Sequence, residues 1–290
     1  MKNLIIVTGG AGFIGSNLIK YLLKKTNLKI ISLDNYSTGT KKNHINHKNV
    51  KYIKGENINI SKILRKYTNK IKVIFHFGEF SRIYQSFLNP KLCLNSNINN
   101  SFEVINFAKE NKIKIIYSAT SSALGNNGKD ENESPYTWAK TKNIELIKNY
   151  SKWFGLKYEL IYFYNVYGPG QILNGPMSAV IGIFETQFRK KKSLTVVRPG
   201  SQKRDFTHIS DIVRGCYLAM IKGRQKDYML CTNKTYSILQ IVKMFNTKYK
   251  FLKSRPGDRF GSSTLNNNAK KILGFEAKID VKEYIKNLIR

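Results

Sequence analysis

A glycine-rich loop near the start of the chain has the residue types and spacing that bind a pyrophosphate. Residues 8–15 read Thr-Gly-Gly-Ala-Gly-Phe-Ile-Gly, directly after a short apolar run and directly before a helical pattern. Gly9, Gly12 and Gly15 permit a tight turn, close approach of the backbone to an anion, and close packing of a helix on a strand. The N-terminus of that helix then faces the anion. The loop therefore predicts a dinucleotide site.

A carboxylate at the end of the next predicted strand agrees with this site. Asp34 follows the glycine loop at the spacing where an acidic side chain binds the hydroxyls of the adenosine ribose. Because a carboxylate disfavours a 2′-phosphate, the sequence predicts NAD rather than NADP. The alternative is that Asp34 and Asn35 simply begin a turn.

A tyrosine, a lysine and a threonine form the second group that could do chemistry. Tyr136 and Lys140 lie one helical turn apart on one face of a predicted helix, and Thr120 follows a predicted strand. A phenol with a pKa of about 10 is a poor base at neutral pH, so a neighbouring cation is needed to favour the phenolate. Lys140 is the predicted cation. The alternative is an exposed aromatic residue and a solvated lysine.

Short β-branched runs alternate with longer helical periods up to about residue 166, which is typical of a parallel sheet with crossover helices. Such a sheet places ligands at the carboxyl ends of its strands, where Thr120 would stand. The predicted strands are Leu4–Thr8, Lys29–Asp34, Lys51–Lys54, Lys72–Phe77, Lys114–Ser118 and Tyr158–Tyr164. The predicted helices are Ile14–Lys24, Ser61–Tyr67, Asn97–Asn111 and Tyr136–Phe154.

After Tyr164 the alternation stops, and glycine and proline residues between 168 and 176 mark a change of architecture. We therefore predict an α/β fold with two domains. Residues 1–166 form a Rossmann-type, doubly wound parallel sheet, and residues 167–290 form a smaller C-terminal α/β domain that binds the substrate. The boundary is expected to be interleaved.

The charge of the chain is strongly positive. Lys and Arg together number 50 against 18 Asp and Glu, a formal net charge of +32. Such an excess of positive charge suggests nucleic acid, an anionic membrane or a polyanionic substrate as a binding partner. The basic residues are, however, spread along the whole chain, and the densest run is only residues 189–192. A dispersed lysine-rich surface is favoured, with neither nucleic acid nor membrane as a partner.

The three cysteines, at positions 93, 216 and 231, have no CxxC spacing, so neither a disulfide framework nor a metal site is predicted. The apolar run Leu4–Val7 is too short for the core of a signal peptide, and no apolar stretch approaches the length of a membrane span. We expect a soluble cytoplasmic protein.

Six stretches in a fixed order resemble the extended short-chain dehydrogenase/reductase family, and more narrowly its NAD-dependent nucleotide-sugar epimerase/dehydratase branch. The segment Asp34–Gly39 is similar to that of UDP-glucose 4-epimerases. The other stretches are the glycine loop, the Thr120/Tyr136/Lys140 set, and residues 165–170, 204–208 and 255–258.

This resemblance implies a role for each matching residue. Thr120, Tyr136 and Lys140 would be the catalytic set. The residues assigned to the NAD cofactor are Gly9, Gly12, Phe13, Ile14, Gly15, Asp34, Asn35, Phe77, Gly78 and Lys140. A nucleotide-diphosphate sugar would be the substrate, with Asn165, Arg204 and Arg255 as its contacts, because a planar guanidinium suits a diphosphate. His208 is expected to be structural, and Arg204 could alternatively pair with Asp205.

Two departures from the family pattern bear on the reaction. Similar enzymes that perform 4,6-dehydration carry a carboxylate just after the active-site threonine, whereas this chain has Ser121 and Ser122. Eliminating water needs a proton acceptor and a proton donor, and serine does neither well at neutral pH. Glu79, where many relatives have a small residue, is a carboxylate that could restore dehydration.

The function predicted is inversion of C4 in a nucleotide-diphosphate hexose through a transient 4-keto intermediate. The enzymatic alternative is a 4,6-dehydratase or ketoreductase of deoxysugar or surface-polysaccharide synthesis. The non-enzymatic alternative is a catalytically silent basic binding protein on the same fold. The resemblance also implies a homodimer that pairs helices 97–111 and 136–154. The apolar residues Phe102, Ile105 and Trp153 would be exposed for this interface, or they could equally cover the sheet of their own domain.

Overall fold

A seven-stranded sheet forms the larger of two lobes in the computed structural model, which describes residues 2–128, 130–258, 261 and 266–290. Every neighbouring pair of strands in the sheet runs parallel. In spatial order the strands are β3 (Val50–Lys54), β2 (Lys29–Asp34), β1 (Leu4–Thr8), β4 (Ile71–His76), β5 (Lys114–Thr120), β6 (Tyr158–Phe163) and β9 (Asp227–Leu230). This order confirms the predicted Rossmann-type doubly wound sheet.

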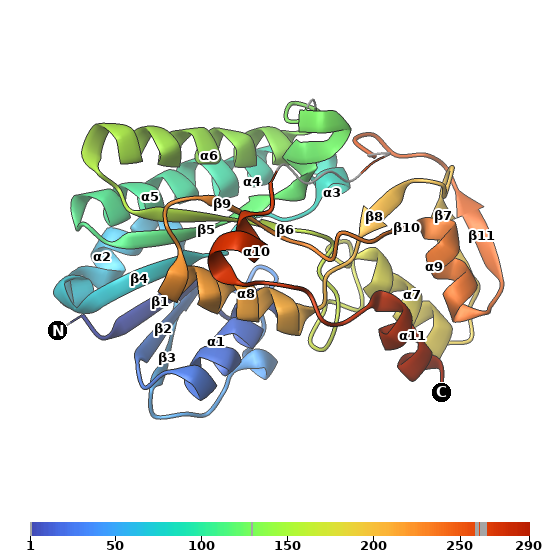
Figure 1. Ribbon diagram of the computed structural model, residues 1–290, viewed down its shortest axis with the longest axis horizontal. Coiled ribbons are helices and arrows are strands. Elements are labelled where there is room, and N and C mark those ends of the chain that lie inside the picture. The colour runs from blue at the N-terminus through green and yellow to red at the C-terminus, as the bar shows by residue number, and fades with distance from the viewer. Residues whose placement is uncertain (1, 129, 259–260, 262–265) are drawn as a thin grey trace.

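Helices cover both faces of the sheet, which is why its central strands read as continuous apolar runs (Figure 1). Leu4 and Ile6 of β1 point to one face, and Ile5 and Val7 point to the other. The first face packs against α2 (Ile60–Leu64), α5 (Asn100–Glu110) and α6 (Pro135–Phe154). The second packs against α1 (Phe13–Lys25), α8 (Ile209–Lys222) and α10 (Asn268–Leu273).

Two predicted helices differ from those observed. The helix expected over Ser61–Tyr67 ends as α2 at Leu64 and continues as a 3₁₀ turn over Arg65–Lys70. The helix expected over Asn97–Asn111 begins as α5 only at Asn100, after a π-helical turn over Asn95–Asn99. Both differences are local changes of helical hydrogen-bond pattern: the chain stays helical but forms wider π-type or tighter 3₁₀-type turns. The other predicted elements are confirmed to within a few residues at their ends.

Local sequence fixes where α6 starts and stops. Ser134 accepts a hydrogen bond from the backbone N–H of Thr137 at 3.0 Å, and Pro135 occupies the first helical position. Gly155 ends the helix with a φ of 70°, a left-handed conformation that glycine adopts without strain. The helix therefore places Tyr136 and Lys140 within its first two turns, at the carboxyl edge of the sheet.

The smaller lobe is built around two short strand pairs. The strands β7 (Leu194–Val197) and β11 (Tyr249–Leu252) run parallel, and β8 (Lys203–Asp205) and β10 (Thr235–Ser237) run antiparallel. The helices of this lobe are α7 (Val180–Arg189), α9 (Ile238–Phe245) and α11 (Val281–Ile289), and they share one apolar core. The strand β9 is part of the seven-stranded sheet, and α8 packs against that sheet. The chain therefore returns to the larger lobe after residue 167 (Figure 1).

The outer surface of α5 and α6 carries large apolar side chains, but not all those predicted. Phe102 is 40% exposed and Trp153 is 58% exposed, whereas Ile105 is fully buried and covers the sheet of its own lobe, which is the alternative for these residues. The homodimer remains a prediction. Among the residues described, none of the helices combines the length and apolar character needed to cross a membrane.

Candidate active site

The glycine loop connects β1 to α1 and forms one wall of the site. The backbone N–H of Gly9 donates to the carbonyl of Leu33 at 2.9 Å, and that of Gly12 donates to the carbonyl of Gly9 at 3.1 Å. A Cβ on Gly15 would lie 2.2 Å from the Gly9 carbonyl oxygen, so only glycine fits there. Gly9 itself has a φ of +70°. This tight backbone cradle at the start of α1 fits the pyrophosphate of a dinucleotide.

Asp34 at the end of β2 braces this loop. Its two carboxylate oxygens accept hydrogen bonds from the backbone N–H groups of Ala11 at 2.9 Å and of Tyr36 at 2.8 Å. Asn35 next to it donates to the carboxylate of Glu56. The carboxylate of Asp34 therefore organises the loop in addition to its predicted contact with the ribose.

All the predicted site residues line one cavity of about 880 Å³ between the two lobes. The larger lobe contributes Gly9, Gly12, Phe13, Ile14, Gly15, Asp34, Asn35, Phe77, Gly78, Thr120, Tyr136 and Lys140. At its edge and on the smaller lobe, the cavity is lined by Asn165, Arg204 and Arg255. The structure thus brings the predicted cofactor, catalytic and substrate residues together.

Thr120 and Tyr136 lie at the centre of this cavity wall. Thr120 is the last residue of β5 and is 5% exposed, and its hydroxyl donates to Ser122 Oγ at 3.0 Å. The backbone N–H of Tyr136 donates to Ser86 Oγ at 3.3 Å, which ties the start of α6 to α3 (Ile83–Leu88). A threonine hydroxyl and a phenol on adjacent walls can hydrogen-bond and deprotonate one hydroxyl of a bound molecule.

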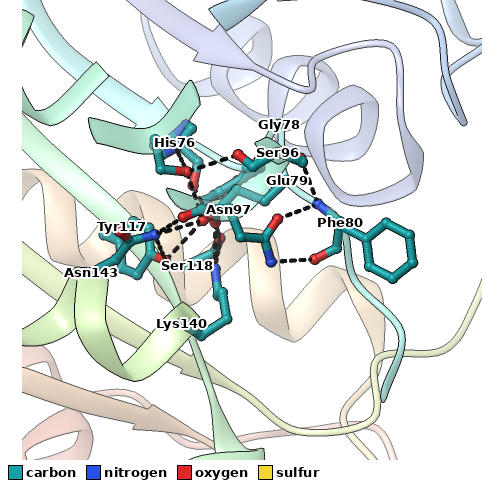
Figure 2. Close-up of polar contacts among 12 residues, drawn as sticks. His76, Gly78, Glu79, Phe80, Ser96, Asn97, Tyr117, Ser118, Lys140 and Asn143 are labelled. Atoms are coloured by element: carbon teal, nitrogen blue, oxygen red, sulfur yellow. Dashed lines mark hydrogen bonds and ion pairs between the residues drawn. The ribbon is translucent and has the colours of Figure 1, made fainter. Parts of the chain in front are cut away.

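Lys140, the predicted cation, is paired with a carboxylate. Its ammonium forms an ion pair with the Glu79 carboxylate, and the two side chains are only 4% and 3% exposed (Figure 2). Burial opposes ionisation of Glu79, but the Lys140 ammonium and the surrounding hydrogen-bond donors outweigh it, so the pKa of Glu79 lies below its ordinary value. Glu79 follows β4 and reaches α6 across the end of the sheet.

A buried histidine links the Glu79 carboxylate to the glycine loop. Thr8 Oγ1 lies 2.7 Å from His76 Nδ1, and Ser101 Oγ lies 3.0 Å from His76 Nε2. Because Thr8 Oγ1 already accepts two backbone N–H groups, it donates to Nδ1, which leaves the proton of the ring on Nε2. The Ser101 hydroxyl in turn donates to Glu79. His76 is therefore neutral in the folded protein.

The pKa of His76 leads to a prediction about stability. Burial lowers this pKa to about 4, against an ordinary value of 6.5. Between about pH 6.5 and pH 4, His76 is protonated in the unfolded chain but neutral in the folded protein. The contribution of this group to the stability of the fold is therefore fully present above pH 6.5 and is lost as the pH falls towards 4. We expect the loss to reach about 3 kcal/mol of unfolding free energy.

Urea unfolding of the wild type and of His76→Gln at pH 7, 5.5 and 4 measures this loss. The glutamine variant is less stable at pH 7, and the gap between the two proteins should close as the pH falls. A gap that stays constant across this range would show that His76 titrates normally.

The two arginines predicted to bind the substrate contact different kinds of partner. Arg204 is 8% exposed and pairs with Asp258 at 2.8 Å, not with Asp205. The Arg255 guanidinium lies 4.7 Å from the centre of the Tyr84 ring. The side-chain amide of Asn165 donates to the Asp205 carbonyl at 2.8 Å.

His208 caps α8 by accepting from the N–H of Ser210, which agrees with a structural role.

Sequence reasoning missed Arg82. Its Nε donates to the carbonyl of Met177 at 2.7 Å, so the side chain bridges the loop after β4 and the segment before α7. Arg82 and Tyr136 line the same cavity, and burial lowers the pKa of Arg82 while Tyr136 opposes this shift. A lone arginine in a loop gives no motif, and only its contacts reveal it.

Comparison with known proteins identifies this architecture. The family model described as NAD dependent epimerase/dehydratase matches residues 5–231. The chain belongs to this family. The match confirms the extended short-chain dehydrogenase/reductase resemblance and, with it, membership of an NAD-dependent enzyme family.

Relatives of the epimerase/dehydratase family cover almost the whole chain. A putative UDP-glucose 4-epimerase of Methanocaldococcus jannaschii is 28% identical over 303 residues, which cover 99% of this chain and 97% of the relative. The UDP-glucose 4-epimerase of Thermotoga maritima, solved with UDP-glucose, superposes with a TM-score of 0.89 at 27% identity, covering 99% of this chain and 97% of that one.

A dTDP-glucose 4,6-dehydratase of Streptomyces venezuelae, solved with NAD bound, has a TM-score of 0.90 at 19% identity, covering 99% and 96% of the two chains. At that identity, the likeness shows the shared fold alone. The same architecture thus serves both the epimerases and the dehydratases of the family.

Proposed function

We propose that the protein is an NAD-dependent epimerase that inverts C4 of a nucleotide-diphosphate hexose through a transient 4-keto intermediate. The observation that carries this proposal is that Thr120 and Tyr136 border the same cavity as the glycine cradle of Gly9 and Gly15. NAD, when bound, accepts a hydride from a sugar carbon and later returns it. The cradle fits such a dinucleotide because a side chain at Gly15 would meet backbone.

The residues of this chain move the proton. Tyr136, as phenolate, takes the proton of the sugar C4 hydroxyl, while Thr120 hydrogen-bonds the same oxygen. When the 4-keto sugar has turned over in the cavity, Tyr136 returns the proton to the oxygen. A cavity enclosed by two lobes supports this because the intermediate must turn without being released.

The charges at the cavity edge select the substrate class. Arg255 and Arg204 line the smaller-lobe side of the cavity, and guanidinium groups suit a diphosphate. Asp258 already pairs with Arg204, so Arg255, stacked on Tyr84, carries more of the unneutralised charge. The large net positive charge adds a general attraction for an anionic substrate.

A product assay tests this function. The protein is incubated with UDP-, dTDP-, GDP- and CDP-hexoses, and the sugar products are followed by NMR. We expect one nucleotide series to yield the C4 epimer, with the amount of bound NAD unchanged after many turnovers. A product that stays 4-keto and 6-deoxy, or a need for added NADPH, would contradict epimerisation.

One observation favours a second reaction, 4,6-dehydration. Glu79 lines the reaction cavity, and an epimerase needs no carboxylate there. To move a proton from the sugar, however, Glu79 would have to give up Lys140 or one of its neutral hydrogen-bond donors. We therefore place dehydration second, and the same NMR assay separates the two reactions by their products.

A further inference from the structure

Glu79 is the centre of a buried hydrogen-bond network on the wall of the cavity (Figure 2). Its Oε1 accepts hydrogen bonds from Ser101 Oγ at 2.9 Å, from the Tyr117 hydroxyl at 2.9 Å and from Asn143 Nδ2 at 3.2 Å. Its Oε2 receives the ammonium of Lys140. Together with Ser118 Oγ, which lies 3.5 Å from Oε2, four neutral donors thus hold the carboxylate in addition to the ammonium.

Lys140 depends on this carboxylate for its position. Its other contacts are Ser118 Oγ at 3.3 Å and the face of the Tyr117 ring, whose centre lies 4.2 Å away. A hydroxyl and a ring hold an ammonium less strongly than a carboxylate does. The only full negative charge among these contacts is that of Glu79, so the pair presents little net charge to the cavity.

We propose that Glu79 is a positioning residue that anchors Lys140 and keeps its ammonium charged, so that the proposed reaction proceeds at a lower pH than it would without the carboxylate. This inference rests on the proposed function, in which Lys140 serves both Tyr136 and the cofactor.

The sign of the effect follows from the charges. Turnover rises with pH as Tyr136 loses its proton, and a nearby positive charge makes that loss easier. Burial lowers the pKa of Lys140 and the Glu79 carboxylate raises it, so removing the carboxylate's charge favours a neutral amine one helical turn from Tyr136. The acid limb of the pH profile should then move to higher pH.

The remaining charged and titratable groups around the pair do not change this sign. Burial lowers the pKa of His76 and raises that of the Cys93 thiol to about 12, and it also raises that of Tyr117, so these three groups stay neutral near neutral pH. Besides the pair itself, the charged residues that line the same cavity are Asp34, Glu56, Arg82, Arg204, Arg255 and Asp258. All six are retained in the variants below, so differences between proteins report on Glu79.

The test compares Glu79→Gln with the wild type in two measurements. In the pH profile of kcat/KM for C4 epimerisation, we expect the acid limb of the variant to lie about one pH unit higher. In calorimetric titration with NAD, we expect the dissociation constant to rise by roughly three- to tenfold, because Lys140 loses both its anchor and the positive charge that attracts an anionic ligand.

Glu159→Gln is the matched control. Glu159 is also a fully buried carboxylate paired with a lysine, Lys114, at 2.7 Å, but it lies outside the cavity lining. This control should lose stability without moving the pH profile or the NAD affinity. Glu79→Ala provides a second variant if the glutamine protein does not fold.

The outcomes are distinct. An unchanged acid limb and an unchanged NAD dissociation constant in a folded Glu79 variant would overturn the inference, and so would an acid limb that moves to lower pH. If the wild type epimerises none of the sugars, the proposed function fails, while the calorimetric titration still decides whether Glu79 anchors Lys140.

Discussion

Tyr136→Phe should lower turnover by roughly a thousandfold while leaving the fold intact, because the variant loses the group that takes the proton from the sugar. Only the phenolic hydroxyl is removed, and the backbone hydrogen bond from Tyr136 to Ser86 remains. The glycine cradle and Asp34 are untouched, so NAD should bind with an affinity close to that of the wild type.

Turnover of the variant is measured by NMR on the sugar that the product assay identifies, and NAD binding by calorimetry. Tyr150→Phe is the control, since Tyr150 lies on the same helix but outside the cavity lining, where its ring packs against Trp153. Turnover within a few fold of the wild type in folded Tyr136→Phe would remove this residue from the mechanism.

Lys140→Met should reduce the free energy of unfolding by roughly 3 kcal/mol, because it leaves the carboxylate of Glu79 buried without its counter-charge. The neutral hydrogen-bond donors around Glu79 reduce this loss of stability, but they supply no positive charge. Turnover should be lost as well. The double variant Glu79→Gln/Lys140→Met should recover part of the stability, because a neutral amide needs no counter-ion.

Urea unfolding at pH 7 measures these changes. The control is Lys148→Met on the same helix, where the lysine side chain is 45% exposed and pairs with Asp227 at 2.9 Å. An exposed pair of this kind contributes less than about 1 kcal/mol. If Lys140→Met costs no more than this control, the buried pair does not stabilise the fold in the way described.

The parts of the fold that could be predicted are those determined by residues close together in the sequence. The bounds of β1 and β2 follow from short β-branched runs, and the glycine loop between β1 and α1 follows from its spacing. The start of α6 is likewise signalled by a serine followed by proline. In each case, neighbouring residues along the chain decide the structure.

Other features depend on residues far apart in the sequence and could not be predicted. Glu79 and Lys140 are brought together only by the packing of α6 against the end of β4, so no motif announces their ion pair. The strand β9 joins the sheet beside β6 although the smaller lobe separates the two in sequence. Arg204 finds its partner in Asp258, and its immediate neighbour Asp205 instead accepts hydrogen bonds from Thr232.

The return of the chain to the larger lobe also protects that lobe from its own sheet edge. Without β9, the strand β6 would present a row of unpaired backbone groups beside apolar side chains, which is a template for pairing with another chain. Instead β9 pairs with β6, and α10 packs against β9, with the side-chain amide of Asn268 donating to the carbonyl of Asp227 at 3.1 Å. By covering this sheet edge, β9 and α10 therefore also lower the tendency of the larger lobe to aggregate.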